Sequence, residues 1–484
     1  MTRTPAAAFL PLAVILFCLA AGVFLPWQLW SLPPYDLQRA FQGGALAWLV
    51  AVGGFQARRP LYCSLAAAAF AQRLVSATVA LLMLLAAALS PFPGIGLLEL
   101  SYLLALGVSV AVLAIHAARL TTLCWMLTGG LLALFMLAYG VFAIDHVRVA
   151  WAVADRHDFG PGFANVRFFA DVAVGVMPLS LLYVVSRQAP SRVAAMLCLA
   201  PLTVWWWLLW VSESRGALLG LVVAGPCALW LLGRGARWPV GLLAISGVMG
   251  LLGWWYLNPL GGAGDSAIFV RDITSGSGRL ALWRDALAYS VEHFPLGLGP
   301  MGFAADGHLR SAHVHNLLLN TAAEWGLPLA LLWLALMLLG CRALIRKARD
   351  MPESSKPVFA CLVMAFVGMM VNVQVAGAQV VPLSALVMVL VTGLVFGYRP
   401  GSGASSAPRA KAPVPIGATL AWAASVLMII YLLIAGLALY RLAVDSTPEC
   451  FRELGRAYLY PRFWSQGRQE CMQLVAPEHW LFRQ

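Results

Sequence analysis

Charged residues are scarce in this 484-residue chain: 11% of the residues are Asp, Glu, Lys or Arg, whereas 61% are hydrophobic. A soluble globular protein has about 25% charged residues, because water must solvate its surface. The scarcity of charge therefore excludes a water-soluble protein and predicts that lipid surrounds most of the chain. Lysine is scarcer still, since only Lys347, Lys356 and Lys411 stand among 32 basic residues.

Cysteine is also sparse, with nine residues. No two of them have the CxxC spacing that is typical of a zinc site, so we predict no metal site. Seven lie in or beside apolar segments, where a thiol serves as a small core side chain. The other two, Cys450 and Cys471, lie in the C-terminal tail. In an oxidising compartment we expect them to form a disulfide, because a short soluble appendage needs such a cross-link.

Long apolar runs are what the sequence has in abundance. A bilayer core about 30 Å thick needs about 20 apolar residues per helix. The chain therefore predicts an all-α, polytopic membrane bundle with about 12 to 14 spans, thirteen being the best count. The predicted spans are 8–28, 40–56, 62–90, 97–115, 121–144, 166–185, 193–211, 216–232, 239–257, 316–340, 357–375, 379–397 and 416–440.

These spans divide the chain into four parts. Nine spans fill residues 1–257, a long loop follows at 258–315, four spans fill 316–440, and a short tail occupies 441–484. The first span is followed by further spans and has no convincing cleavage site, so it reads as a retained helix rather than a signal peptide.

The distribution of basic residues predicts the orientation. With the N-terminus in the cytoplasm, Arg3 and alternate short loops hold 16 basic residues and two acids, a net charge of +14, whereas the rest of the chain has a net charge of −2. Cytoplasmic loops of membrane proteins carry such an excess. We therefore predict an integral membrane protein with its N-terminus in the cytoplasm and its C-terminus on the outer side, which is the periplasm in a bacterial inner membrane. The positive charge reflects topology and does not indicate binding to nucleic acid.

The long loop at 258–315 then faces the periplasm. Loops of this length in a compact protein are usually functional or disordered. Residues 277–293 place Leu280, Trp283, Leu287 and Val291 at helical spacing, which predicts an amphipathic helix at the membrane interface, in contact with membrane lipids. A Gly/Pro turn at 295–302 follows, and its backbone amides could approach a phosphate.

Two histidines stand where this loop enters the next predicted span. His313 and His315 precede Asn316, and Glu324 lies about two turns deeper, in a place too apolar for an unpaired carboxylate. Histidine is suited to proton transfer near neutral pH, so we predict that His315 and His313 are catalytic. Asn316 and Glu324 would support them. The alternative is that a histidine at a helix end is a cap or a structural hydrogen-bonding group.

Several arginines belong to the predicted periplasmic side. Arg215 and Arg279 follow Ser/Gly-rich turns, where backbone amides and a guanidinium can converge on an anion. We predict that both bind phosphate, with Arg167 and Arg284 as further candidates. The alternative is that each arginine pairs with a neighbouring acid, for example Arg167 with Asp171 four residues on. A basic pocket beside a proton acceptor suits a lipid-anchored substrate with an anionic head group.

Four motifs in this order resemble the superfamily of O-antigen ligases, O-antigen polymerases and bacterial protein O-oligosaccharyltransferases. The motifs are Asn165-Val-Arg167-Phe-Phe, Ser-Glu-Ser-Arg215-Gly, Ser-Gly-Ser-Gly-Arg279 with the Pro-Leu-Gly-Leu-Gly-Pro that follows, and His315-Asn316-x9-Gly326. Together they cover about residues 160–330, while the N-terminal third agrees only in being polytopic.

The resemblance implies a metal-independent glycosyltransferase. It would move a preassembled glycan from undecaprenyl diphosphate to an acceptor hydroxyl and need no cofactor, nucleotide sugar or Mg²⁺, because the diphosphate lipid is the activated donor. Arg215 and Arg279 would hold the diphosphate, and His315 would act as the base or orient the acceptor. His313 and Arg167, with Asn165 in its motif, would play secondary roles.

The acceptor would distinguish the members of this superfamily. Lipid A core implies an O-antigen ligase, Ser or Thr of a protein such as pilin implies a protein O-oligosaccharyltransferase, and a growing glycan implies a polymerase. The Asn-x-Arg-Phe-Phe element favours the first two, between which the sequence does not choose. A transporter of lipid-linked sugars is a less favoured alternative, because the chain shows no repeated or inverted halves.

Overall fold

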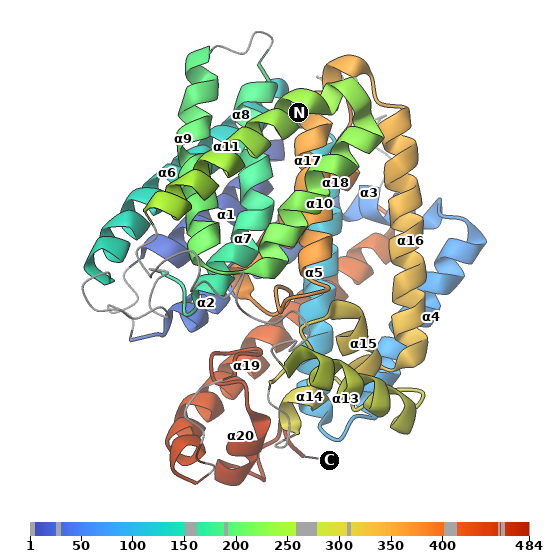
Figure 1. Ribbon diagram of the computed structural model, residues 1–484. Helices are drawn as coiled ribbons and strands as arrows, with labels where there is room; N and C mark the ends of the chain where they lie inside the picture. The colour runs from blue at the N-terminus through green and yellow to red at the C-terminus, as the bar shows by residue number, and fades with distance from the viewer. Residues whose placement is uncertain are drawn as a thin grey trace. The chain divides into compact units, whose positions relative to one another are not determined.

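The computed structural model describes residues 5–25, 31–150, 162–187, 192–257, 278–306, 311–400, 414–453, 455 and 460–483 (Figure 1). These residues form helices and turns, and they contain no strand. The predicted all-α class is confirmed. Ten helical stretches among them are long and apolar enough to cross a membrane, so the chain is an integral membrane protein. The count of thirteen spans stays a prediction.

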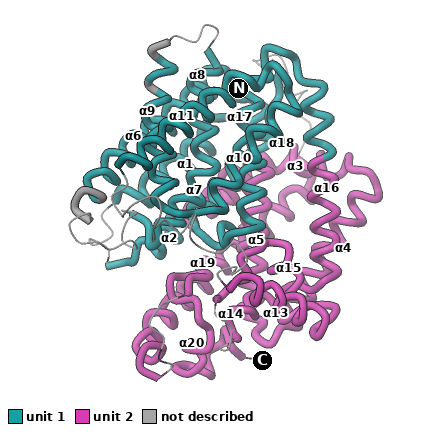
Figure 2. The backbone as a smooth tube through the Cα atoms, in the orientation of Figure 1, with its two compact units in different colours: residues 1–41, 113–275, 342–410 teal, residues 42–112, 276–341, 411–484 magenta. Residues whose placement is uncertain are grey.

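The chain forms two compact units, each built from three separate segments (Figure 2). Unit 1 comprises residues 1–41, 113–275 and 342–410, and unit 2 comprises 42–112, 276–341 and 411–484. The predicted division of the chain into consecutive parts did not anticipate this interleaving. Three helices contribute residues to both units: α2 (Pro34–Trp48), α5 (Pro93–Ala117) and α16 (Leu327–Arg349).

The helices of unit 1 come from all three of its segments. They are α1 (Pro5–Phe24), α6 (Thr122–Ala150), α7 (Val166–Ser180), α8 (Leu182–Val185), α9 (Arg192–Val211), α10 (Arg215–Leu232), α11 (Arg237–Tyr256), α17 (Lys356–Asn372) and α18 (Pro382–Gly397), with short 3₁₀ turns at Gly233–Ala236 and Glu353–Ser355. Helix α18 is apolar but only 16 residues long, so it falls outside the ten candidate spans.

Unit 2 holds the remaining helices. They are the π-helical turn Leu49–Gly53, α3 (Gly54–Ala66), α4 (Phe70–Ala88), α13 (Arg279–Glu292), α14 (Gly302–Ala305), α15 (Leu317–Trp325), α19 (Ile416–Arg452) and α20 (Gln469–Val475). Helix α19 continues past residue 440, where the last predicted span ended.

Several predicted spans have different bounds in the structure. The span predicted at 40–56 runs across the end of α2, the π-helical turn and the start of α3. The span predicted at 62–90 is divided, because α3 ends at Ala66 and α4 begins at Phe70. The span predicted at 316–340 is divided at Gly326, whose φ of +90° ends α15, and the apolar stretch long enough to span is Leu327–Arg349. Glu324 therefore precedes the span instead of lying within it.

Glycines let three helices of unit 1 approach closely. A Cβ atom added at Gly220 of α10 would lie 2.6 Å from the carbonyl oxygen of Gly368 in α17, and one at Gly368 would lie 2.9 Å from Val174 of α7. Small residues at such contacts allow membrane helices to gain van der Waals contact along their backbones. The same packing fixes the N-terminus of α10, where Arg215 stands.

A buried polar anchor ties α2 to the turn between α17 and α18. The hydroxyl of Tyr35 and the guanidinium of Arg39 both donate to the carbonyl oxygen of Val380, at 2.7 and 2.6 Å. Arg39 also donates to the Tyr35 hydroxyl at 3.1 Å. A backbone carbonyl without a hydrogen-bond donor is costly in an apolar interior. These two donors therefore stabilise a turn whose carbonyl groups are not all bonded within a helix.

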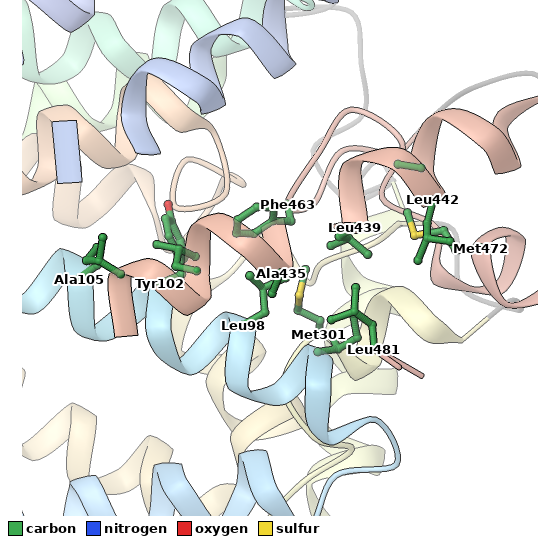
Figure 3. Packing of buried hydrophobic residues seen from close by; sticks show 14 of the residues in the cluster. Leu98, Tyr102, Ala105, Met301, Ala435, Leu439, Leu442, Phe463, Met472 and Leu481 are labelled. Atoms are coloured by element: carbon green, nitrogen blue, oxygen red, sulfur yellow. The ribbon is translucent and has the colours of Figure 1, made fainter. Parts of the chain in front are cut away.

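The core of unit 2 joins α5, α19 and the C-terminal tail (Figure 3). Leu98 and Tyr102 of α5 pack with Ala435 and Leu439 of α19, and the tail adds Phe463, Met472, Leu481 and Phe482. A second cluster joins α13 to α15 through Leu282, Ala286, Phe303, Val314 and Ala323. The tail is therefore part of the folded core of this unit.

We expect Gly220→Ala to destabilise the protein by about 1–3 kcal/mol, because the added methyl group would collide with the backbone of α17. Gly241→Ala in α11 is the matched control, since no atom lies within 4 Å of a Cβ placed there. Thermal unfolding in detergent measures the difference. Equal melting temperatures of the two variants would contradict the close approach of α10 and α17.

Candidate active site

The two histidines lie in a short loop, 311–316, that leads into α15 and is called the His loop below. Asn316 is the N-cap of α15, where its Oδ1 accepts the backbone N–H of Leu319 at 2.9 Å. His315 has a φ of +57°, a conformation that costs a non-glycine residue about 1 kcal/mol or more. Ser311 Oγ lies 3.3 Å from Nε2 of His315. The rings of His313 and His315 lie 4.1 Å apart, centroid to centroid.

His313 lies deeper than His315, with 7% of its surface exposed. Burial lowers the pKa of His313 well below its usual range, and the charges of His315, Arg462 and Arg279 act in the same direction. The backbone carbonyl of Pro461 opposes them. These effects favour the neutral form of the His313 imidazole. It can orient a neighbour or a substrate, but it carries no positive charge for an anion.

Helix α13 holds Arg279 and Arg284 and packs against the His loop. Trp283 Nε1 donates to the carbonyl oxygen of Val314 at 3.2 Å, and Leu282 lies in the shared core. Arg279 is the first residue of α13 and is half-buried, whereas Arg284 is exposed. The structure therefore brings Arg279 and the two histidines together in unit 2.

The amphipathic pattern of this helix differs in one respect from the prediction. Leu280, Leu287 and Val291 face outward and are exposed, but Trp283 belongs to the side that packs on the His loop. The buried side is formed by Leu282, Ala286 and Ser290. An outward row of apolar residues is typical of a helix at a membrane interface, and Arg284 lies among them.

Arg167 and Asn165 lie at the start of α7 in unit 1. Asn165 is the N-cap, and its Oδ1 accepts the backbone N–H of Arg167 at 2.9 Å. Arg167 is exposed and makes no ion pair within the described residues. The alternative pairing with Asp171 is wrong, because Asp171 is buried and accepts the side-chain amide of Asn372 at 2.7 Å.

Arg215 is the first residue of α10 and is half-buried. It follows a tight turn in which Glu213 has a φ of +53°. A Cβ added at Gly216 would lie 2.9 Å from Oδ1 of Asn372, so this end of α10 packs directly on the end of α17. Asn372 was not among the predicted site residues, although an asparagine in an apolar span is a signal in itself.

The four arginines are divided between the units. Arg167 and Arg215 belong to unit 1, and Arg279 and Arg284 belong to unit 2 with the histidines. A shared phosphate site that uses both groups stays a prediction.

The Gly/Pro turn at 295–302 does not present its central amides to a ligand. The N–H of Gly297 donates to the carbonyl of His293, and that of Leu298 to the carbonyl of Ala323, both at 2.8 Å. A Cβ at Gly326 would lie 1.9 Å from the carbonyl oxygen of Pro295. The turn and Gly326 therefore serve to pack the loop against the end of α15, which explains the glycine of the His-Asn-x9-Gly motif.

Glu324 has a partner that sequence analysis did not identify. Its carboxylate accepts the side-chain amide of Asn320 at 2.8 Å and lies 2.5 Å from Arg462 of the C-terminal tail. Burial raises the pKa of Glu324 to about 7, although Arg462 acts in the opposite direction. The distance of 138 residues between the partners explains why sequence spacing gave no signal.

The tail that carries Arg462 is cross-linked. Cys450, near the end of α19, and Cys471 in α20 form a disulfide with their Cα atoms 5.3 Å apart. Among the described residues, no three His, Cys, Asp or Glu side chains gather in a way that could hold a metal ion.

The comparison with protein families covers the centre of this site. Residues 200–334 match the family model of the O-antigen ligases. This stretch is an O-antigen ligase family domain. The match includes Arg215, Arg279, His313 and His315, while Arg167 lies before it. No curated protein matches the chain. The resemblance inferred from the motifs is confirmed by this match.

We expect the stability of the protein to fall as the pH rises through about 7, because folding holds a proton on Glu324 that an unfolded chain releases near pH 4.3. This contribution is complete below about pH 4.3 and is lost above the folded pKa of about 7. Glu324→Gln should flatten the dependence of the melting temperature on pH between about 5 and 8.

Glu292→Gln is the control for that measurement, since Glu292 is exposed at the end of α13 and its carboxyl is hydrated in both states. It should leave the slope unchanged. An identical slope in wild type and Glu324→Gln would contradict the raised pKa of Glu324.

Proposed function

We propose that this protein transfers a preassembled glycan en bloc from undecaprenyl diphosphate to an acceptor hydroxyl on the periplasmic face of the bacterial inner membrane. The observation that carries the proposal is the His loop beside Arg279, at the entry to a membrane helix and within the O-antigen ligase domain. This arrangement joins a proton acceptor and a phosphate-binding group where a lipid-anchored donor can reach both.

The proposed reaction has one bond-making and one bond-breaking event. The acceptor oxygen bonds to the anomeric carbon of the glycan while the bond from that carbon to the diphosphate oxygen breaks. The hydroxyl proton passes to the imidazole of His315, and undecaprenyl diphosphate leaves with the electron pair. Arg279 and Arg215 would stabilise the charge that develops on the leaving group, because a guanidinium donates two parallel hydrogen bonds to phosphate oxygens.

The side chains around His315 fit this role. Its ring is half-buried, Ser311 Oγ lies 3.3 Å from Nε2, and the neutral His313 ring lies beside it. A neutral neighbour adds no repulsion when His315 takes up a proton. Arg167 and Arg284 are exposed and suit initial attraction of the diphosphate head group, or of phospholipid head groups.

The proposed orientation places the tail in the periplasm. The Cys450–Cys471 disulfide supports this placement, because such bonds persist in oxidising compartments. We propose the lipid A core or a Ser/Thr side chain of a protein such as pilin as acceptor. The alternative activities are glycan polymerisation and, less favoured, transport of the lipid-linked sugar.

The decisive experiment is incubation of purified protein with a glycan on undecaprenyl diphosphate and each acceptor class in turn. We expect transfer to lipid A core or to a pilin, and a loss of at least about 100-fold in His315→Ala, since general base catalysis contributes that much. His293 is exposed and follows the last residue of α13, outside the His loop. The control variant His293→Ala should therefore keep wild-type activity.

The outcomes separate the alternatives. Elongation of the donor glycan alone would identify a polymerase. Undiminished transfer by His315→Ala at equal protein level would remove the catalytic role of the His loop. Absence of transfer to any acceptor, together with movement of the lipid-linked sugar across vesicle membranes, would identify a transporter.

We expect Arg215→Lys to lose about 10- to 100-fold in activity, because an ammonium group cannot reproduce the bidentate geometry of a guanidinium. Arg237→Lys is a matched control, since Arg237 also begins an apolar helix, α11, but lies in a predicted cytoplasmic loop. Activity retained in Arg215→Lys and lost in Arg215→Ala would reduce the role of Arg215 to simple charge attraction.

A further inference from the structure

A buried cluster of charges connects the C-terminal tail to the His loop. It consists of Arg462 from the tail, Glu324 from α15 and Glu99 from α5, and it is called the Arg462 cluster below. The guanidinium of Arg462 lies 2.5 Å from Oε2 of Glu324 and 3.3 Å from Oε1 of Glu99. Arg462 is 3% exposed and Glu324 is fully buried.

Hydrogen bonds lead from this cluster to the backbone between the two histidines. The carboxylate of Glu324 that pairs with Arg462 also accepts the side-chain N–H of Asn320 at 2.8 Å. The Oδ1 of the same Asn320 accepts the backbone N–H of Val314 at 3.2 Å. Val314 stands between His313 and His315. The side chains of Glu324 and Asn320 therefore connect Arg462 to the His loop.

The His loop needs such support because its conformation is strained. His315 is held at a φ of +57°, in the left-handed region that favours glycine. The hydrogen bond to Val314 fixes the residue before it, and the N-cap bond of Asn316 fixes the residue after it. Loss of the first bond would let the backbone at His315 relax and turn its ring away from Ser311.

The tail that presents Arg462 is itself firmly mounted. Phe463 and Met472 pack with α5 and α19 in the core of unit 2 (Figure 3). Trp464 Nε1 donates to the carbonyl of Gly436 in α19 at 2.9 Å. The Cys450–Cys471 disulfide closes the segment that contains Arg462. A short tail thus holds one guanidinium in a fixed position beside α15.

Stability alone does not account for a charge in this place. Removing an arginine and two carboxylates from water is costly, and apolar residues of similar volume often stabilise a protein as well or better. The positive charge of Arg462 also acts on the site directly, because it disfavours a proton on His313 together with Arg279 and His315. The Arg462 cluster therefore affects both the geometry and the charge of the His loop.

We propose that Arg462 is a positioning residue for His315, and that the C-terminal tail is a working part of the active site. The inference rests on the proposed glycan transfer. Arg462 holds Glu324 and Asn320 in place, these two residues hold Val314, and the loop keeps the His315 ring where an acceptor hydroxyl can meet it.

The first test compares Arg462→Met with Arg468→Met. Arg468 is an equally buried tail arginine that lies 3.2 Å from Glu470 and 4.0 Å from the Tyr460 ring, so its loss removes a buried tail charge that pairs with a different acid. We expect Arg462→Met to lower kcat about 100-fold with an unchanged KM for the lipid-linked donor, as a small misplacement of a catalytic group does. Arg468→Met should keep kcat within about threefold, since it leaves His315 in place.

Two further variants keep the test informative if Arg462→Met folds poorly. Arg462→Lys retains the charge and should recover part of kcat. Glu324→Gln/Arg462→Met removes the buried carboxylate that would be left without its partner, so it should fold better than Arg462→Met. Its kcat should nevertheless stay low, because Asn320 loses its charged partner. Wild-type kcat in this double variant, or equal losses in Arg462→Met and Arg468→Met, would overturn the proposal.

A second measurement does not depend on glycan transfer. Diethyl pyrocarbonate modifies accessible neutral imidazoles, and mass spectrometry locates the modified residues. We expect modification of the buried His313 to rise several-fold in Arg462→Met and in Cys450→Ser/Cys471→Ser, but not in Arg468→Met. Unchanged modification of His313 in Arg462→Met would show that the tail does not position the loop. Failure of wild-type transfer would refute only the proposed function, since this measurement would still decide the role of Arg462.

Discussion

The pairing of Glu324 with Arg462 is the interaction on which the rest of unit 2 depends. A carboxylate without exposed surface is tolerated only when oppositely charged and hydrogen-bonding groups surround it, and here Arg462 and Asn320 do so. To supply the arginine, the chain must return from α19 and insert its tail against α5 and α15. The disulfide, the aromatic core and the His loop all follow from that return.

Buried polar groups in unit 1 also need hydrogen-bond partners, and they find them in short side chains and in the backbone. Asp171 is buried and satisfied by Asn372, and Arg39 donates to a carbonyl that no helix satisfies. Glycines at 216, 220 and 368 let α10 and α17 approach closely. Arg215 stands at the end of this contact, so its position is set by helices that cannot shift easily. A rigid mount of this kind suits a guanidinium that must meet a diphosphate in a defined geometry.

The motifs of the O-antigen ligase family acquire physical roles in this structure. The asparagine after His315 caps a helix. Position 326 needs glycine, because any Cβ atom there would collide with the carbonyl oxygen of Pro295. The Pro-Leu-Gly-Leu-Gly-Pro turn packs against α15 through its amides rather than presenting them to phosphate. Asn316, Gly326 and the Gly/Pro turn therefore hold His315 in its strained conformation at the entry to a membrane helix.

Sequence alone determined the membrane environment, the all-helical class and most helix bounds, and it supplied the candidate site residues. These features depend on local signals: apolar runs of sufficient length, arginines in short loops, and polar residues where lipid would exclude them. Only the tertiary structure decided the break of the helix at Gly326, the inward side of Trp283, and the partners of Glu324 and Asp171. Such partners are chosen by packing between segments far apart in the chain, and periodicity within one segment holds no information about them.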